Sequence, residues 1–83
     1  MTAAAEAHRI YVTFGADHTH PVSGRNLANH YVVVDGTDYE DCRRQTVQRF
    51  GNRWSFDYLT RVATGADRFG LTEVDLATGE LVP

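Results

Sequence analysis

The fold is decided by residues 37–51, which read TDYEDCRRQTVQRFG. Apolar side chains recur in this stretch every three or four residues, a spacing that places them on one face of an α-helix. They are Tyr39, Cys42, Thr46, Val47 and Phe50. We therefore predict a helix from Asp38 to Phe50 whose apolar face covers the core, with Cys42 as a buried structural thiol.

Both ends of this helix carry boundary signals. The segment from Thr37 to Glu40 matches a capping box, in which the threonine hydroxyl accepts a hydrogen bond from the third helical amide and the glutamate reaches back to the cap. Acidic residues follow at the positive end of the helix dipole, and Arg49 lies at the negative end. Gly51 is expected to end the helix, because glycine is the usual residue just past a helix C-terminus.

Two strands are predicted before the helix. Residues 9–15 alternate, with Ile10 and Val12 on the apolar face, which is typical of a half-buried strand. Residues 30–35 are apolar on both faces, which indicates a central strand with the helix on one side and a partner surface on the other. Residues 16–28 join the two strands as a long loop.

More strands are predicted after the helix. Residues 54–60 form the third strand, and we expect its aromatic face of Trp54, Phe56 and Tyr58 to belong to the core. The remaining chain is predicted as a turn, a strand, a hairpin turn and a short return strand, at residues 64–67, 71–76, 77–79 and 80–82.

These elements predict an α+β fold with a single helix packed on a small, mainly antiparallel sheet. Their order is β-β-α-β followed by a C-terminal β-hairpin. Residues 9–83 form a single domain, and residues 1–8 are expected to be a flexible terminus. One helix covers one face of the sheet, so we expect the face of Tyr11 and Thr13 to be solvated or buried against a second subunit. Because so short a chain buries a limited share of its surface alone, we expect a homo-oligomer.

Composition narrows the function classes. Hydrophobic residues make up 42% of the 83 residues and charged residues 23%, which is too apolar for a disordered chain and too mixed for a membrane span. A net charge of −3 argues against nucleic-acid binding, and a single cysteine excludes a disulfide scaffold. The first residues show no secretory signal, which favours the cytoplasm.

All eight basic residues are arginines, as expected from a GC-rich genome or from a need for bidentate anion contacts.

Four short stretches of the chain form a recognisable pattern: IYVTFG at residues 10–15, HTH at 18–20, FG at 50–51 and WSFDY at 54–58. Over residues 9–59 this pattern resembles small orphan proteins encoded by bacteriophages of actinobacteria. It implies a phage or prophage origin in a GC-rich host, with the host cytoplasm as the place of action. The group has no assigned function, so the resemblance transfers no catalytic or binding residue.

Candidate ligand contacts gather around the third strand. Five of the eight arginines lie between residues 43 and 61, close to three aromatic residues. Guanidinium groups beside aromatic rings hold nucleotides, with the ring stacking on the base and the arginine bound to phosphate, and they also form hot spots of protein interfaces. The predicted ligand-binding residues are Phe14, His18, His20, Arg25, Arg43, Arg53, Trp54 and Tyr58.

The histidine loop allows other interpretations. His18 and His20, with Asp17 or His30, have the spacing of a zinc site, but they also fit a solvated loop or a contact to a ligand or sheet edge. The turn around Arg25 could offer an anion its amides and guanidinium, or could be a plain polar turn. We predict no metal, no cofactor and no catalytic residue.

The functional hypothesis is a non-enzymatic phage accessory protein that counteracts host antiviral defence by sequestering a nucleotide-type signal. Arg25, Arg43 and Arg53 would meet phosphates, while Trp54, Tyr58 or Phe14 would stack on bases. One alternative is a protein–protein inhibitor of a host enzyme or defence complex. Two others are a small metal-dependent hydrolase built on His18, His20 and an aspartate, and a virion or assembly component.

Overall fold

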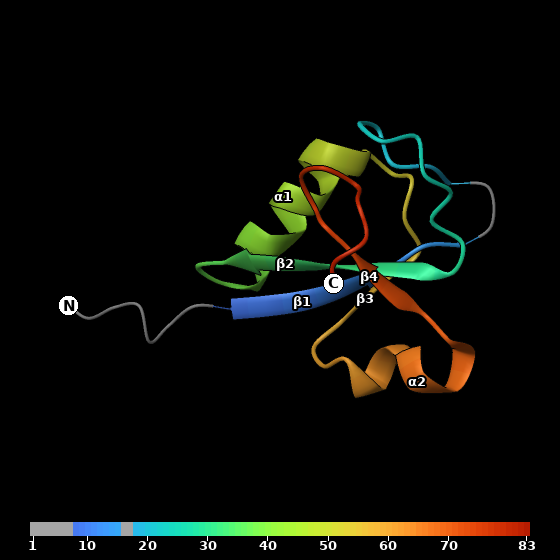
Figure 1. Ribbon diagram of the computed structural model, residues 1–83. Coiled ribbons are helices and arrows are strands. Elements are labelled where there is room, and N and C mark those ends of the chain that lie inside the picture. The colour runs from blue at the N-terminus through green and yellow to red at the C-terminus, as the bar shows by residue number, and fades with distance from the viewer. Residues whose placement is uncertain (1–7, 16–17) are drawn as a thin grey trace.

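Four strands form one mixed sheet in the computed structural model, which describes residues 8–15 and 18–83 (Figure 1). The strands are β1 His8–Thr13, β2 His30–Gly36, β3 Phe56–Tyr58 and β4 Thr72–Val74, in the spatial order β3-β1-β2-β4. β1 pairs antiparallel with β2 and β3, whereas β2 and β4 run parallel. The α+β class with a mainly antiparallel sheet is confirmed. Residues 1–8 were expected to form a flexible terminus. Residues 1–7 lie outside the described residues, and His8 is the first residue of β1.

The helix α1, Tyr39–Phe50, covers one face of the sheet (Figure 1). Its buried side chains Cys42, Thr46 and Phe50 pack over the sheet at the centre of the core. The strand side chains of this core are Ile10, Val12, Val32, Val34 and Val74. Burial raises the pKa of the Cys42 thiol, so the predicted role of this residue as a buried structural thiol is confirmed.

The start of α1 differs from the prediction by one residue. Asp38 is the N-cap, and its carboxylate accepts a hydrogen bond from the Asp41 N–H at 2.8 Å. The Asp41 carboxylate in turn accepts from the Thr37 N–H at 3.0 Å, which lowers the pKa of Asp41. The stretch therefore contains two overlapping capping patterns, Thr37 with Glu40 and Asp38 with Asp41. The structure uses the second pattern, because an ionised carboxylate accepts a hydrogen bond from an amide more strongly than a hydroxyl does.

The C-terminal end of α1 follows the prediction. Gly51 has a φ of 62°, and its N–H donates to the Val47 carbonyl at 2.7 Å. Glycine adopts this positive φ at little cost because it has no Cβ atom.

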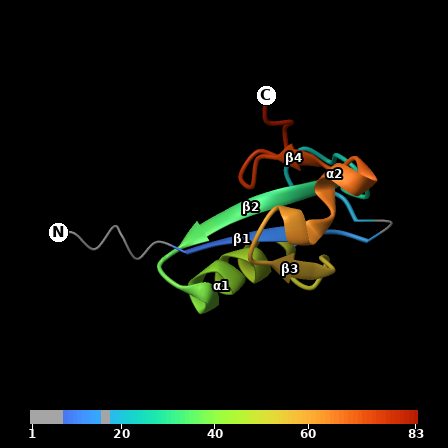
Figure 2. The same ribbon diagram turned by 90° about the horizontal axis from the view of Figure 1, so that it is seen from below.

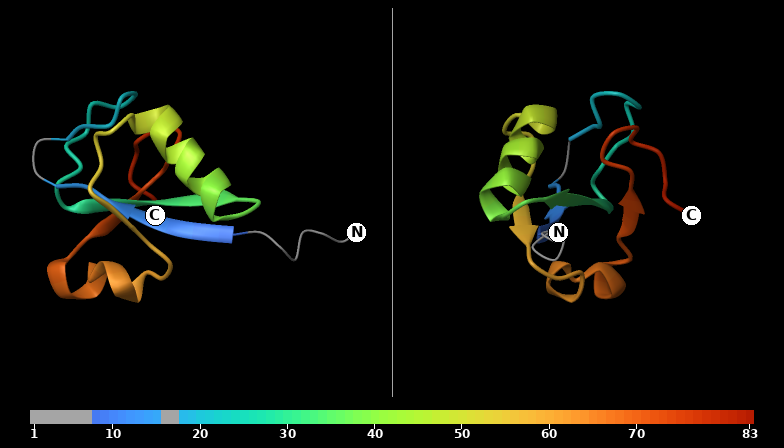
Figure 3. Two further views of the ribbon diagram at one scale, coloured as in Figure 1. Left: turned by 180° about the vertical axis from the view of Figure 1, so that it is seen from behind. Right: turned by 90° about the vertical axis from the view of Figure 1, so that its left-hand side faces the viewer.

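The opposite face of the sheet is covered in part by the chain itself. A 3₁₀-helix, η2 Val62–Thr64, and a short helix, α2 Ala66–Phe69, lie on the side away from α1 (Figures 1 and 3). Seen from below, this segment crosses in front of the central strands (Figure 2). Arg61 anchors it, because its Nε donates to the Tyr31 hydroxyl at 3.0 Å. Residues 64–67 were predicted as a turn and instead span the end of η2 and the start of α2. The second face of the sheet was expected to meet solvent or another subunit, and this is wrong where the η2–α2 segment covers it.

The third strand is shorter than predicted, and two of its three predicted aromatic residues, Phe56 and Tyr58, lie outside the core. Phe56 and Tyr58 pair with Thr13 and Tyr11, so they share the face away from α1. Phe56 is 65% exposed, because β3 lies at the edge of the sheet. The expected burial of this face in the core is therefore wrong for Phe56 and Tyr58, because the strand presents Asp57 to α1 instead. It holds in part for Trp54, which is half-buried and packs against the core.

The C-terminal hairpin is reduced to a single antiparallel bridge between Val74 and Leu81. The turn between them is closed by the Asp75 carboxylate, which accepts from the N–H groups of Ala77 and Thr78. These amide contacts, led by that of Thr78, lower the pKa of Asp75.

The shifted cap can be tested by substitution. Asp38→Ala should lower the free energy of unfolding by about 1 kcal/mol, because the Asp41 amide loses its acceptor. Thr37→Ala is the matched control and should cost much less, since the contact of Thr37 to Asp41 is made by its backbone. Urea denaturation followed by circular dichroism measures both values. Equal losses, or a larger loss for Thr37→Ala, would contradict the assignment of Asp38 as the cap.

Candidate functional site

The eight predicted ligand residues do not converge on one site. Two of them lie in the interior. Phe14 packs edge-on against Phe50, with ring centroids 5.0 Å apart. His20 is 1% exposed, and its Nε2 lies 2.9 Å from the Leu76 carbonyl while its Nδ1 accepts from the Val22 N–H at 3.1 Å. Both ring nitrogens of His20 are therefore occupied by backbone groups.

The two other histidines suggested for a metal site, His18 and His30, take part in structural contacts. His18 is half-buried, and its carbonyl accepts from the Leu27 N–H at 2.8 Å. The His30 Nδ1 lies 2.7 Å from the Thr72 hydroxyl. Among residues 8–15 and 18–83, no three histidine, cysteine, aspartate or glutamate side chains are grouped closely enough to hold a metal ion. The suggested ligand Asp17 lies outside the described residues.

Arg25 holds the C-terminal turn in place. Its Nε donates to the Gly79 carbonyl at 3.1 Å, and its guanidinium lies 3.5 Å from the Glu80 carboxylate. The Ser23 hydroxyl donates to the same Gly79 carbonyl. Gly79 has a φ of 76°, and a Cβ atom there would lie 2.5 Å from the His20 ring, so only glycine fits this close contact.

Arg43 and Trp54 are brought together on the outside of α1. The Arg43 guanidinium lies 5.4 Å from the Trp54 ring centroid and 6.0 Å from that of Tyr39. Its Nε is 3.4 Å from the Asp57 carboxylate, which also accepts from the Tyr39 hydroxyl at 2.8 Å. This hydrogen bond raises the pKa of Tyr39. We call the area formed by Tyr39, Arg43, Val47 and Trp54 the Arg43 surface.

The Arg43 surface is broad and open. Two hollows of about 610 and 590 Å³ lie along it, and both are lined by Arg43 and Val47. Val47 is 50% exposed, although the sequence pattern placed it on the apolar face of the helix. An exposed arginine with aromatic and aliphatic neighbours is the composition of protein-interface hot spots.

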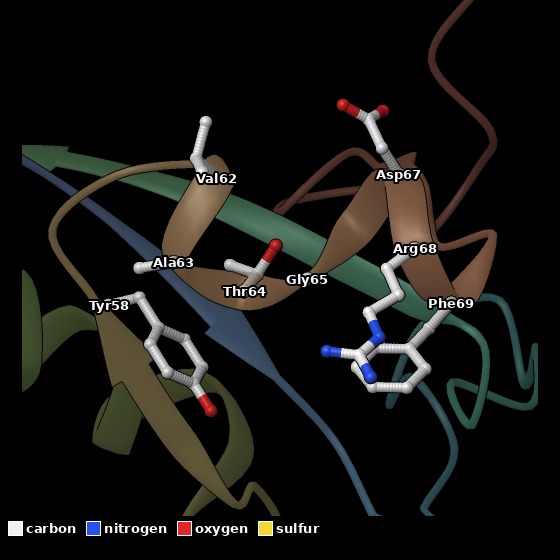
Figure 4. A pocket seen from close by; sticks show the side chains of 8 residues that line it. All are labelled: Tyr58, Val62, Ala63, Thr64, Gly65, Asp67, Arg68 and Phe69. Atoms are coloured by element: carbon white, nitrogen blue, oxygen red, sulfur yellow. The ribbon is translucent and has the colours of Figure 1, made fainter.

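A second, more concave site lies between β3 and the η2–α2 segment. It is a pocket of about 440 Å³ lined by Tyr58, Val62, Ala63, Thr64, Gly65, Asp67, Arg68 and Phe69 (Figure 4). The rings of Tyr58 and Phe69 stand on opposite sides of this pocket, while the side chains of Val62 and Asp67 point away from them (Figure 4). The Arg68 guanidinium lies 5.6 Å from the Phe69 ring centroid. We call this site the Tyr58–Phe69 pocket.

The turn at Gly65 builds this pocket. Its φ of 76° joins η2 to α2, and a Cβ atom at this position would lie 2.7 Å from the Phe69 ring. The ring therefore packs directly on the glycine backbone. The buried Thr64 hydroxyl donates to the Arg61 carbonyl at 2.6 Å and accepts from the Ala66 N–H at 3.0 Å, which fixes the floor of the turn.

Of the predicted ligand residues, only Tyr58 lines this pocket. Arg68 and Phe69 were missed, although they repeat the signal used elsewhere, an arginine beside an aromatic residue. Both residues lie outside residues 43–61, the arginine-rich region on which the sequence prediction concentrated. They come near Tyr58 only because the η2–α2 segment crosses the sheet. The last predicted residue, Arg53, lines a small cleft with Arg49 at the end of α1.

Comparisons with family models, curated proteins and solved structures found no match to this chain. None of the helices in the described part of the chain has the length and apolar character needed to cross a membrane.

The stacking of Arg43 on Trp54 can be tested with the protein's own fluorescence, because the chain has a single tryptophan. Arg43→Ala should uncover the indole, shift its emission to longer wavelength and raise its quenching by acrylamide. The loss of stability should be about 0.5–1 kcal/mol, the usual value for an exposed cation–π contact. Arg44→Ala, in the same helix but paired with Asp41, is the control and should leave the emission unchanged. An unchanged spectrum in Arg43→Ala would show that the two groups do not stack in solution.

Proposed function

We propose that this protein acts by binding, and that the Tyr58–Phe69 pocket sequesters a nucleotide-type ligand. The observation that carries the proposal is the pairing of two aromatic rings with the Arg68 guanidinium around one concave site. Its volume of about 440 Å³ is that of a small-molecule site. Aromatic rings stack on bases of any sequence, and a guanidinium binds a phosphate through two parallel hydrogen bonds.

The charges around the pocket support an anionic ligand. Asp67 is the acidic residue of the lining, and it is paired with Arg61 at 2.8 Å. Arg68 forms no ion pair with any residue that the structure describes, so its positive charge is available to a phosphate. The net charge of −3 belongs to the protein as a whole and does not decide the potential at this site.

The resemblance to phage proteins supports a biological setting for such binding. We propose an accessory protein of phage origin that works in the host cytoplasm and lowers the concentration of a nucleotide signal used in antiviral defence. A sequestering protein needs affinity and abundance but no catalytic group, which agrees with a pocket formed by rings, a guanidinium and a glycine turn.

Exposed apolar side chains near the pocket support self-association. Phe56, Val62 and Phe69 are 65%, 83% and 66% exposed, and the Phe56 and Tyr58 ring centroids are 6.4 Å apart. Exposed apolar side chains that cluster in this way are typical of surfaces that bind another molecule. We propose that they contribute to a homo-oligomer.

Ligand binding can be measured by thermal unfolding in the presence of cyclic and linear nucleotides. A nucleotide at 100 times its Kd should add about 2.7 kcal/mol of apparent stability. Arg68→Gln should raise the Kd roughly tenfold or more, because a charged hydrogen bond to phosphate is lost. Phe69→Ala should weaken binding by removing a stacking face.

The matched control is Arg44→Gln, which removes an exposed arginine far from the pocket and should leave the Kd unchanged. Sedimentation with and without the nucleotide gives the oligomeric state in the same samples. The proposal fails if no nucleotide stabilises the protein, or if Arg68→Gln and Arg44→Gln bind equally well.

A second candidate function is inhibition of a host protein through the Arg43 surface. The observation that favours it is the openness of this surface, where Val47 and the stacked Arg43 and Trp54 border two broad hollows. The ion pair with Asp57 leaves Arg43 little net charge for a phosphate, so packing against a protein fits it better. We expect a host protein retained by the wild type to be lost from an Arg43→Glu bait and kept by an Arg68→Gln bait. Equal retention by the two baits would exclude this surface.

A further inference from the structure

A small cleft at the C-terminal end of α1 is lined by two arginines. Arg49 comes from the last turn of the helix, and Arg53 follows Gly51. Thr19 and Pro21 close the other side, the Phe50 ring completes the cleft, and its volume is about 180 Å³.

The core holds the walls of this cleft in position. The ring of buried Phe50 packs edge-on against His20, with centroids 5.5 Å apart, and this fixes the loop that carries Thr19. The Arg53 N–H donates to the Phe50 carbonyl at 2.9 Å, which ties the second arginine to the end of the helix. The loop and the helix end therefore meet at a defined place.

The two arginines differ from most others in the chain. Five arginines form ion pairs with carboxylates, namely Arg9, Arg25, Arg43, Arg44 and Arg61. Arg49 and Arg53 form none with residues 8–15 and 18–83. Two like charges that share a narrow cleft repel each other, and a bound anion removes this repulsion.

We propose that this cleft binds a tetrahedral oxyanion of the phosphate type. Its volume suits one phosphate group and is too small for a whole nucleotide. Planar guanidinium groups bind such oxygens through paired hydrogen bonds, and the Thr19 hydroxyl adds a neutral donor. The phosphate can be free or can belong to a larger molecule whose remainder lies outside the cleft.

The site is independent of the Tyr58–Phe69 pocket. α1 lies on one side of the sheet and the η2–α2 segment on the other (Figure 3). Failure at one site therefore leaves the other proposal unaffected.

The 83-residue protein is titrated with inorganic phosphate, and separately with chloride at equal ionic strength, while its melting temperature is followed. Phosphate should raise the melting temperature of the wild type with saturation, whereas chloride should not. Arg49→Gln with Arg53→Gln should raise the Kd for phosphate at least tenfold. Circular dichroism checks that this double variant is folded, which we expect because both side chains are exposed.

A matched control locates the effect. Arg44→Gln removes another exposed arginine from the same helix and should bind phosphate as the wild type does. Adenosine monophosphate is the second probe. Binding of this probe through the Arg49–Arg53 pair would identify a phosphate carried by a larger molecule, and binding of inorganic phosphate alone would identify the free ion. Equal effects of phosphate and chloride, or unchanged phosphate binding in the double variant, would overturn the proposal.

Discussion

The structure depends on the burial of β2 on both of its faces. Val32 and Val34 face α1, while Tyr31 is buried on the opposite side. A strand that is apolar on both faces needs a covering layer on each side. Among the described residues, α1 is the one long helix, and it covers one side. The second layer is the η2–α2 segment, which Arg61 fastens to the Tyr31 hydroxyl.

This division of the covering elements leaves β3 incompletely packed. The strand lies at the edge of the sheet and receives α1 on one side and the η2–α2 segment on the other. Consecutive residues of a strand point to opposite faces, so Asp57 joins the Arg43 surface while Tyr58 lines the pocket. This short strand therefore contributes one residue beside each candidate binding surface, Asp57 next to the Arg43 surface and Tyr58 in the Tyr58–Phe69 pocket.

The sequence predicts the parts of this fold that rest on local signals. The periodicity of α1, the glycine at its end and the alternation in β1 depend on neighbours within a few residues, and all three are confirmed. The parallel pairing of β4 with β2 and the covering role of residues 61–69 depend on contacts between distant segments, which no local pattern contains. The same distinction holds for the sites. Arg43 and Trp54 were expected to act together and do lie side by side, whereas Tyr58 and Phe69 line one pocket only because the η2–α2 segment crosses the sheet.

The use of arginine shows why composition alone says little about function here. A coding preference for arginine over lysine would not explain the contacts that the guanidinium groups make. Arg61 lies over the Tyr31 ring, donates to its hydroxyl and binds Asp67, and Arg43 lies beside two rings while it pairs with Asp57. The compact ammonium group of a lysine cannot stack on a ring and present a planar array of donors at the same time. At these two positions arginine makes contacts that a lysine could not make. Arg53 and Arg68 have no ion pair among the described residues, and Arg49 has only the favourable negative end of the α1 dipole, so these three arginines are where we look for binding.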